Sequence, residues 1–102
     1  MRAEFFTVEF LGEALPMRRL SALEELELPH RAAAVLPKLL KLLPDIGKAE
    51  AIAQNAALLS FALLDGPKDP EGILGELGLS EIAKLCQGYY TGSASQDFYE
   101  EG

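Results

Sequence analysis

The sequence predicts a mainly α-helical protein of the α+β class, in which an N-terminal β-hairpin precedes a small bundle of four to five helices. A short segment rich in aromatic and β-branched residues alternates with period two near the N-terminus, whereas leucines further along recur at helical spacing. Capping signals and Gly or Pro residues divide the rest into helix-sized pieces. With 102 residues, 49% of them apolar, the chain is long enough for one core in one domain.

The hairpin is predicted from two strand-like segments joined by a short turn. Residues 4–10 read Glu-Phe-Phe-Thr-Val-Glu-Phe, a composition that favours a strand. Residues 11–13 form the turn, in which Gly12 can adopt a positive φ. The chain then returns over residues 14–19 as the second strand.

A capping box predicts where the first helix begins. Ser21 stands at the N-cap and Glu24 follows three residues later, so each side chain can satisfy a backbone N–H of the first turn. The helix therefore begins at Ala22. We expect it to stop near Leu28, because Pro29 has no N–H and disfavours the helical conformation in the residue before it.

Residues 30–43 predict an amphipathic helix. Its apolar face, here called the leucine stripe, consists of Leu36, Leu39, Leu40 and Leu43. Lys38 and Lys41 fall on the other side. Pro37 removes an internal hydrogen bond, so we expect either a kink there or a break into two short helices, and Pro44 closes the segment.

Two further helices and a loop complete the domain. Residues 48–64 are rich in Ala and Leu and have no polar face, which predicts the central buried helix. The Gly- and Pro-rich stretch up to Gly78 indicates a loop with at most a short helix at residues 73–77. Ser80 then caps a last helix, which we expect to end at Gly92. Its apolar stripe consists of Ile82, Leu85, Cys86, Tyr89 and Tyr90.

The domain prediction divides the chain after Gly92. Residues 1–92 form a single helical domain with its hairpin, and residues 93–102 form a flexible acidic tail. The tail is small, polar and acidic, and has too little apolar area to offset its ordering entropy. Phe98 and Tyr99 in this tail are either an aromatic anchor that orders on binding or part of a frayed terminus.

Charge and cysteine content exclude several classes of protein. Nine basic and 16 acidic residues give a net charge of −7, and the basic residues are scattered, which disfavours binding to nucleic acid or to anionic membranes. The most apolar run, residues 49–64, contains Glu50, Gln54 and Asn55 and is too short for a membrane span. A single cysteine, Cys86, fits a reducing compartment. We therefore expect a soluble cytoplasmic protein.

The sequence contains no catalytic or metal-binding motif with a full set of residues. His30 follows Glu27 at the Glu-x-x-His spacing of helical di-metal sites, but the second histidine and the further carboxylates are missing. Cys86 lies on an apolar stripe, where burial raises the pKa of a thiol away from the reactive thiolate. We expect a protein that is not an enzyme and that holds no metal and no cofactor.

Apolar helical surface remains as the candidate for function. The predicted protein-binding residues are Leu36, Leu39, Leu40, Leu43, Tyr89 and Tyr90. They supply more apolar area than a few short helices need among themselves, which suits an oligomer or partner interface. The alternative is that the same residues form a dense core.

The order of these segments resembles the tail assembly chaperones of long-tailed bacteriophages and related prophages. The similarity covers most of the chain. The hairpin FFTVEFLGEALPMRRL runs into the Ser-capped helix SALEELEL, a long apolar helix ends in ALLSFALLDGPKDPEGILGEL, and LSEIAKLCQGYYTGS closes the domain. The resemblance implies a non-enzymatic chaperone, several copies of which coat the hydrophobic tape measure protein and keep it soluble until the tail tube protein polymerises around it. It also implies a homo-oligomer in the cytoplasm of the bacterial host.

A second hypothesis comes from a different class. The chain would be a small acidic helical adaptor or regulatory protein that binds a specific bacterial protein partner through its acidic tail. Deletion of the residues after Gly92 separates the two hypotheses, because an adaptor of this kind loses its partner whereas a client-coating chaperone loses much less.

Overall fold

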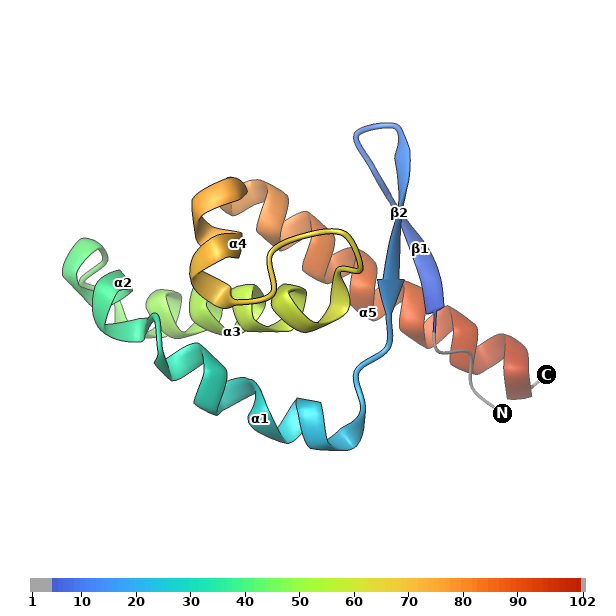
Figure 1. Ribbon diagram of the computed structural model, residues 1–102, viewed down its shortest axis with the longest axis horizontal. Helices are drawn as coiled ribbons and strands as arrows, with labels where there is room; N and C mark the ends of the chain where they lie inside the picture. Colours follow the sequence, from blue (N-terminus) through green and yellow to red (C-terminus); the bar gives the residue numbers. More distant parts are fainter. Residues whose placement is uncertain (1–4, 102) are drawn as a thin grey trace.

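The computed structural model describes the backbone of residues 5–101 and the side chains of residues 5–93. Within this range a two-stranded hairpin is followed by five helices, which confirms the predicted α+β fold class (Figure 1). The elements are β1 (Phe5–Phe10), β2 (Glu13–Arg18), α1 (Ala22–Ala33), α2 (Leu36–Leu42), α3 (Ile46–Ala62), α4 (Pro70–Glu76) and α5 (Leu79–Glu101). No helix in the described part of the chain is both long and apolar enough to cross a membrane.

The hairpin is antiparallel and closes through a two-residue turn. Its register runs from Phe5 opposite Arg18 to Phe10 opposite Glu13. The turn residues Leu11 and Gly12 have φ values of 52° and 80°. Positive φ at both central residues is what a type I′ turn requires, and this turn matches the twist of the two strands. The predicted hairpin is therefore confirmed. Its second strand begins and ends one residue earlier than predicted, and residue 4, the predicted start of the first strand, lies outside the described residues.

The capping box is present at the start of α1, but the predicted end of this helix is wrong. The Ser21 hydroxyl accepts a hydrogen bond from the Glu24 N–H at 3.2 Å, and a Glu24 carboxylate oxygen accepts one from the Ser21 N–H at 2.9 Å. The helix then continues through Pro29 to Ala33 instead of stopping near Leu28. The residues after the proline are held by tertiary contacts, since Ala32 is buried with α3 residues in one cluster.

The helix is interrupted just before the leucine stripe. A break into two short helices was one of the two alternatives predicted from Pro37. α1 ends at Ala33, and α2 begins at Leu36 with Pro37 in its first turn. A proline costs little there, because the N–H groups of a first turn have no intrahelical partner. α2 ends at Leu42, ahead of Pro44, as predicted.

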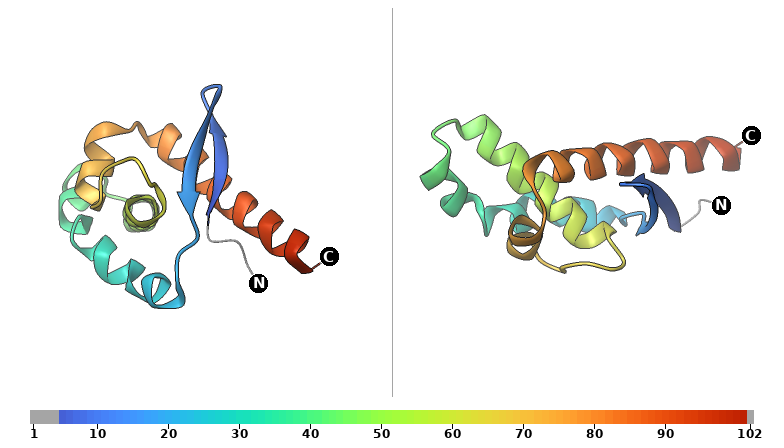
Figure 2. Two further views of the ribbon diagram at one scale, coloured as in Figure 1. Left: turned by 45° about the vertical axis from the view of Figure 1, so that its right-hand side comes forward. Right: turned by 90° about the horizontal axis from the view of Figure 1, so that it is seen from above.

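α3 is the central helix, and its burial confirms the prediction. Figure 2 shows it end-on in the left view, with α1, α2 and α4 arranged around it. Asp45 caps its start by accepting a hydrogen bond from the Lys48 N–H at 3.2 Å. The second half of the helix is enclosed almost without interruption: Ala56, Ala57, Leu58, Leu59, Ser60, Phe61 and Ala62 are all buried.

The predicted ends of the last helix are both wrong. α5 begins at Leu79, where the Gly78 N–H donates to the Glu81 carboxylate at 2.8 Å, so Ser80 lies inside the helix. It also continues past Gly92 to Glu101. Gly92 is a packing residue: a Cβ there would lie 2.8 Å from a ring carbon of Phe6. The side chains of the predicted acidic tail, from residue 94 on, lie outside the described residues, so its flexibility stays a prediction.

Two hydrophobic clusters divide the core. The larger joins the hairpin to α3, α4 and α5, and includes Phe6, Val8, Met17, Leu59, Ile73, Ile82, Leu85 and Tyr89. The smaller joins α1 and α2 to α3, and consists of Ala32, Val35, Leu39, Ala49, Ala53 and Ala57. Alanines supply most of the smaller cluster, so α1 and α2 can approach α3 closely but bury little side-chain area there.

Candidate functional site

The leucine stripe is divided between the core and the surface. Leu39 is buried against α3, Leu36 and Leu43 are half-buried, and Leu40 is 37% exposed. Leu42, which lies off the stripe, is 75% exposed. The sequence therefore predicted helix over most of the leucine stripe, but the predicted start at residue 30 is wrong, because residues 30–33 belong to α1, and the prediction missed Leu42, the most exposed leucine of α2.

An apolar groove opens between α2 and α4. Its volume is about 620 Å³, within the range of about 300–1,000 Å³ that is typical of ligand sites. We call it the α2–α4 groove. It is lined by Lys38, Leu39, Leu42, Leu43, Ile52, Glu71, Leu74, Gly75 and Leu79. Two residues of the leucine stripe thus meet residues from α3, α4 and the start of α5.

The groove keeps large apolar side chains in contact with solvent. Leu42 and Leu79, on its two sides, are 75% and 57% exposed. A single exposed leucine is ordinary, but exposed leucines that share one hollow are typical of a surface that binds another apolar surface. Leu39 and Leu74 lie deeper in the groove and are more enclosed.

One ion pair links the two sides of the groove. The Lys38 ammonium lies 2.8 Å from a Glu71 carboxylate oxygen, which joins α2 to α4. Both side chains are largely exposed, so water and salt screen the pair and it contributes little to stability. A bound partner can therefore displace this contact at small cost.

The two tyrosines of the predicted binding set do not act together, and neither lines the groove. Tyr89 is buried, and its hydroxyl accepts a hydrogen bond from the Leu20 N–H at 3.1 Å. Tyr90 is 59% exposed and meets Tyr89 edge-on, with ring centroids 5.4 Å apart. Partial burial raises the pKa of the Tyr90 phenol above its ordinary value. Tyr89 is a core residue, and Tyr90 alone offers a surface.

The residues considered for chemistry lie apart from one another. Cys86 is buried, and burial raises the pKa of its thiol to about 12, which removes the thiolate at neutral pH. His30 is exposed on α1. Among the described residues, no group of three or more His, Cys, Asp or Glu side chains could hold a metal ion.

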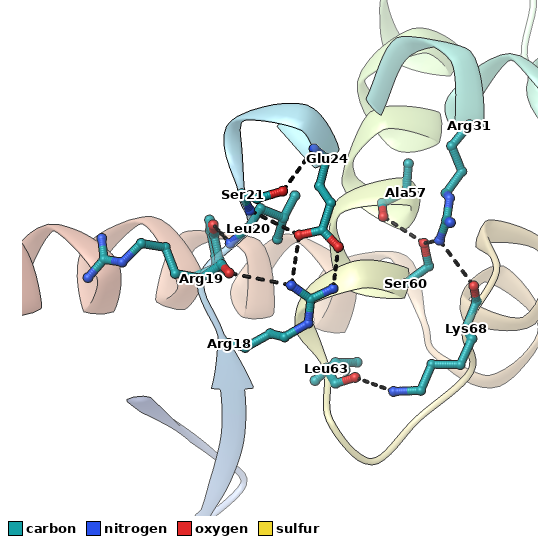
Figure 3. Close-up of polar contacts among 11 residues, drawn as sticks. Arg18, Arg19, Leu20, Ser21, Glu24, Arg31, Ala57, Ser60, Leu63 and Lys68 are labelled. Atoms are coloured by element: carbon teal, nitrogen blue, oxygen red, sulfur yellow. Dashed lines mark hydrogen bonds and ion pairs between the residues drawn. The ribbon is translucent and has the colours of Figure 1, made fainter. Parts of the chain in front are cut away.

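A polar network near the C-terminal end of α3 holds α1 in place. The Arg31 guanidinium lies 3.7 Å from the centroid of the Phe61 ring. It also donates to the Ser60 hydroxyl at 3.0 Å and to the Lys68 carbonyl at 3.1 Å, as Figure 3 shows. The Lys68 ammonium in turn donates to the Leu63 carbonyl at 2.8 Å, near the end of α3. These contacts support the scaffold that carries the groove, and the sequence alone did not predict them.

Comparison with known protein families, with curated proteins and with solved structures finds no match.

Proposed function

We propose that this protein is a non-enzymatic chaperone that covers an apolar segment of a client protein, in the manner of a phage tail assembly chaperone acting on the tape measure protein. The observation that carries the proposal is the solvent-open α2–α4 groove, with exposed Leu42 and Leu79 on its sides. The resemblance of the chain's segment order to tail assembly chaperones supports the same assignment.

The groove suits reversible binding of an apolar helix. Each leucine-sized side chain that a client buries gains about 1.5–3 kcal/mol from removal of its apolar area from water. A hollow of about 620 Å³ accepts only a few such side chains. The ordering costs of association offset much of this gain, so each copy binds weakly. Weak binding by several copies keeps a long client soluble and still lets it go when tail tube subunits assemble around it.

The charge of the chain supports the same role. A net charge of −7 makes coated clients repel one another, which keeps a long apolar filament dispersed in the cytoplasm of the host cell.

Solubilisation of a client fragment tests the proposal. An apolar helical fragment of a phage tape measure protein is co-expressed with the protein, and the soluble fraction of the fragment is measured. The double variant Leu42→Glu, Leu79→Glu places two charges in the groove and should reduce that fraction to the level without chaperone. Leu11→Glu is the matched control, because Leu11 is 78% exposed at the hairpin turn, away from the groove.

The remaining predicted surface and the adaptor hypothesis are tested in the same assay. Tyr90→Glu asks whether the exposed tyrosine contributes to client binding. Deletion of residues 93–102 should leave most solubilisation intact in a client-coating chaperone. Unchanged solubilisation by the groove variant, with its helical circular dichroism and melting temperature retained, would remove the groove from the mechanism.

A further inference from the structure

The outer edge of β1 has no strand beside it in the described part of the chain. The sheet consists of β1 and β2 alone. Among residues 5–101, the isolated bridge of Met17 with Leu63 lies on β2. β2 therefore has β1 on one edge and the end of α3 on the other, whereas β1 has a partner on one edge.

The register identifies which backbone groups face outward. In a hairpin with a two-residue turn, the pair next to the turn, here Phe10 and Glu13, exchanges both hydrogen bonds, and such pairs alternate along the ladder. Thr7 opposite Pro16 is then a pair without mutual hydrogen bonds. Pro16 agrees with this, because it has no N–H and its carbonyl accepts a bond from the Leu64 N–H at 3.4 Å, away from β1. The backbone N–H and C=O of Thr7 therefore point to the open side.

By the same alternation, the backbone N–H and C=O groups of Phe5 and Glu9 also point to the open side, in one row with those of Thr7. Side chains of this row are all exposed, while the intervening Phe6 and Val8 are buried. The row offers up to six backbone donors and acceptors at the spacing of an antiparallel neighbour. An unpaired row of this kind is a template for an added strand.

A shallow hollow of about 450 Å³ runs beside this strand. Thr7 and Glu9 line one side of it, and the polar residues Lys84, Gln87 and Thr91 of α5 line the other. Figure 2 shows α5 passing the hairpin and extending beyond it. The hollow therefore lies between the unpaired edge of β1 and a polar surface of α5.

Two glycines explain why α5 lies so close to this strand. A Cβ on Gly88 would lie 2.4 Å from a methyl carbon of Val8, and one on Gly92 would lie 2.8 Å from the Phe6 ring. α5 therefore lies directly against the inner face of β1.

This closeness excludes pairing of β1 with β1 of a second copy. Two paired strands are about 4.8 Å apart, whereas packed helices need about 8–10 Å between their axes. A two-fold axis would put both copies of α5 on the same face of the joint sheet, where they would collide. The occupant must be a strand without a helix beneath it.

We propose that the outer edge of β1 binds one extended peptide segment of a partner protein as a third, antiparallel strand. The charged residues that line the site specify the chemistry of the bound segment. It carries a basic side chain opposite Glu9 and an acidic side chain at the adjacent position, which faces Lys84 of α5. This site is separate from the α2–α4 groove and does not depend on the proposed function.

The experiment uses backbone amides as reporters. In the free protein, hydrogen exchange measured by NMR should be fast for the Thr7 and Glu9 amides and slow for those of Phe6 and Val8. The probe is a capped heptapeptide of alternating threonine and valine in which one residue is replaced by lysine and its neighbour by glutamate. Its addition should shift the Thr7 and Glu9 resonances and slow their exchange.

Thr7→Pro is the decisive variant. It removes the outward N–H and leaves the hairpin ladder intact, since the opposite residue is already Pro16. Affinity for the peptide should fall at least tenfold, whereas Thr7→Val should bind like the wild type. Slow exchange of the Phe6 and Val8 amides, as in the wild type, establishes that the hairpin of the variant is folded.

Glu9→Lys provides a test that does not depend on the proline variant. It should weaken binding of the lysine peptide and strengthen binding of the same peptide with glutamate in place of lysine. Peptide binding that Thr7→Pro leaves unchanged, or no peptide binding to the folded wild type, would overturn the proposal. Slow hydrogen exchange of the Thr7 amide in the free protein would also overturn the proposal, whether or not the exchange rate depends on protein concentration.

Discussion

The hydroxyl of Tyr89 accepts a hydrogen bond from the backbone N–H of Leu20 at 3.1 Å, and both residues are buried. Leu20 lies between the end of β2 and the start of α1, so neither a strand nor a helix uses its N–H. The Tyr89 ring also packs against Phe6, with centroids 5.6 Å apart. One side chain of α5 thus holds the hairpin and the first helix together.

Tyr89→Phe should destabilise the fold although it removes only one oxygen atom. The Leu20 N–H would be left buried without an acceptor, which costs about 1–3 kcal/mol. Urea denaturation followed by circular dichroism should show a lower midpoint with an unchanged slope. Tyr90→Phe is the control, because Tyr90 is exposed and should shift the midpoint little. Equal effects of the two substitutions would contradict the assigned role of Tyr89.

Glu24 should make stability depend on acid pH. Arg18 donates two hydrogen bonds to its carboxylate, one of them at 2.8 Å (Figure 3), and these bonds are the main reason that the pKa of Glu24 is lowered from 4.5 to about 2. A lowered folded-state pKa means that the stabilisation is complete above pH 4.5 and is lost as the pH falls toward 2. Because the pair is partly exposed, we expect a loss of about 1 kcal/mol.

Glu24→Gln isolates this contribution. Glutamine keeps a side chain that can complete the capping box but carries no charge. The variant should therefore have a shallower dependence of unfolding free energy on pH between pH 5 and pH 2, measured by urea denaturation at each pH. Glu25→Gln controls for net charge. A slope that Glu24→Gln leaves as steep as that of the wild type would show that other groups carry the dependence.

The sequence predicted those features that are determined over a few neighbouring residues. Ser21 and Glu24 identify the start of α1 because each satisfies the backbone beside the other. The hairpin follows from strand composition and from Gly12 at a position with positive φ. The central position of α3 follows from the lack of charge after Glu50. None of these depends on what packs against the segment.

Features that depend on distant residues were missed. Gly92 has the composition signal of a helix end, but its function is to admit the Phe6 ring, which lies far away in sequence. The α2–α4 groove likewise needs the position of Leu79 relative to Leu42, which no local pattern contains. A period-3.6 pattern shows which leucines share a helix face, but not which face the fold leaves uncovered.

The two prolines of the α1–α2 segment should respond oppositely to removal. Pro29 is inside α1, where it deletes a hydrogen bond and strains the preceding turn at a cost of about 3 kcal/mol. Pro29→Ala should stabilise the protein by about 1–2 kcal/mol, because the more flexible unfolded chain offsets part of the gain. Pro37 is in the first turn of α2, so Pro37→Ala should give no stabilisation.

Thermal denaturation distinguishes the two proline variants. A higher melting temperature for Pro29→Ala alone is expected, together with increased helical circular dichroism at 222 nm, a wavelength that reports helix content. A destabilised Pro29→Ala variant would contradict the cost assigned to a proline inside α1.

Gly88→Ala should destabilise the fold even though alanine is the better helix former. A Cβ at this position would lie 2.4 Å from a methyl carbon of the buried Val8, so β1 must move away from α5. Overpacking of this kind costs about 1–3 kcal/mol, which exceeds the gain of about 1 kcal/mol in helix propensity. Gly75→Ala on α4 is the matched control, because nothing lies within 4 Å of its Cβ position, and it should be neutral or stabilising.

A double-mutant cycle with Val8→Ala assigns the cost to this contact. Val8→Ala alone destabilises by loss of buried apolar area. In that background the clash is gone, so adding Gly88→Ala should stabilise the protein by its helix propensity instead of destabilising it. The free energies of unfolding of the four proteins, from urea titration, should therefore give a coupling energy equal to the cost of overpacking, about 1–3 kcal/mol. Additive effects would mean that β1 does not contact α5 at Gly88. In that case α5 would no longer exclude pairing of β1 with β1 of a second copy.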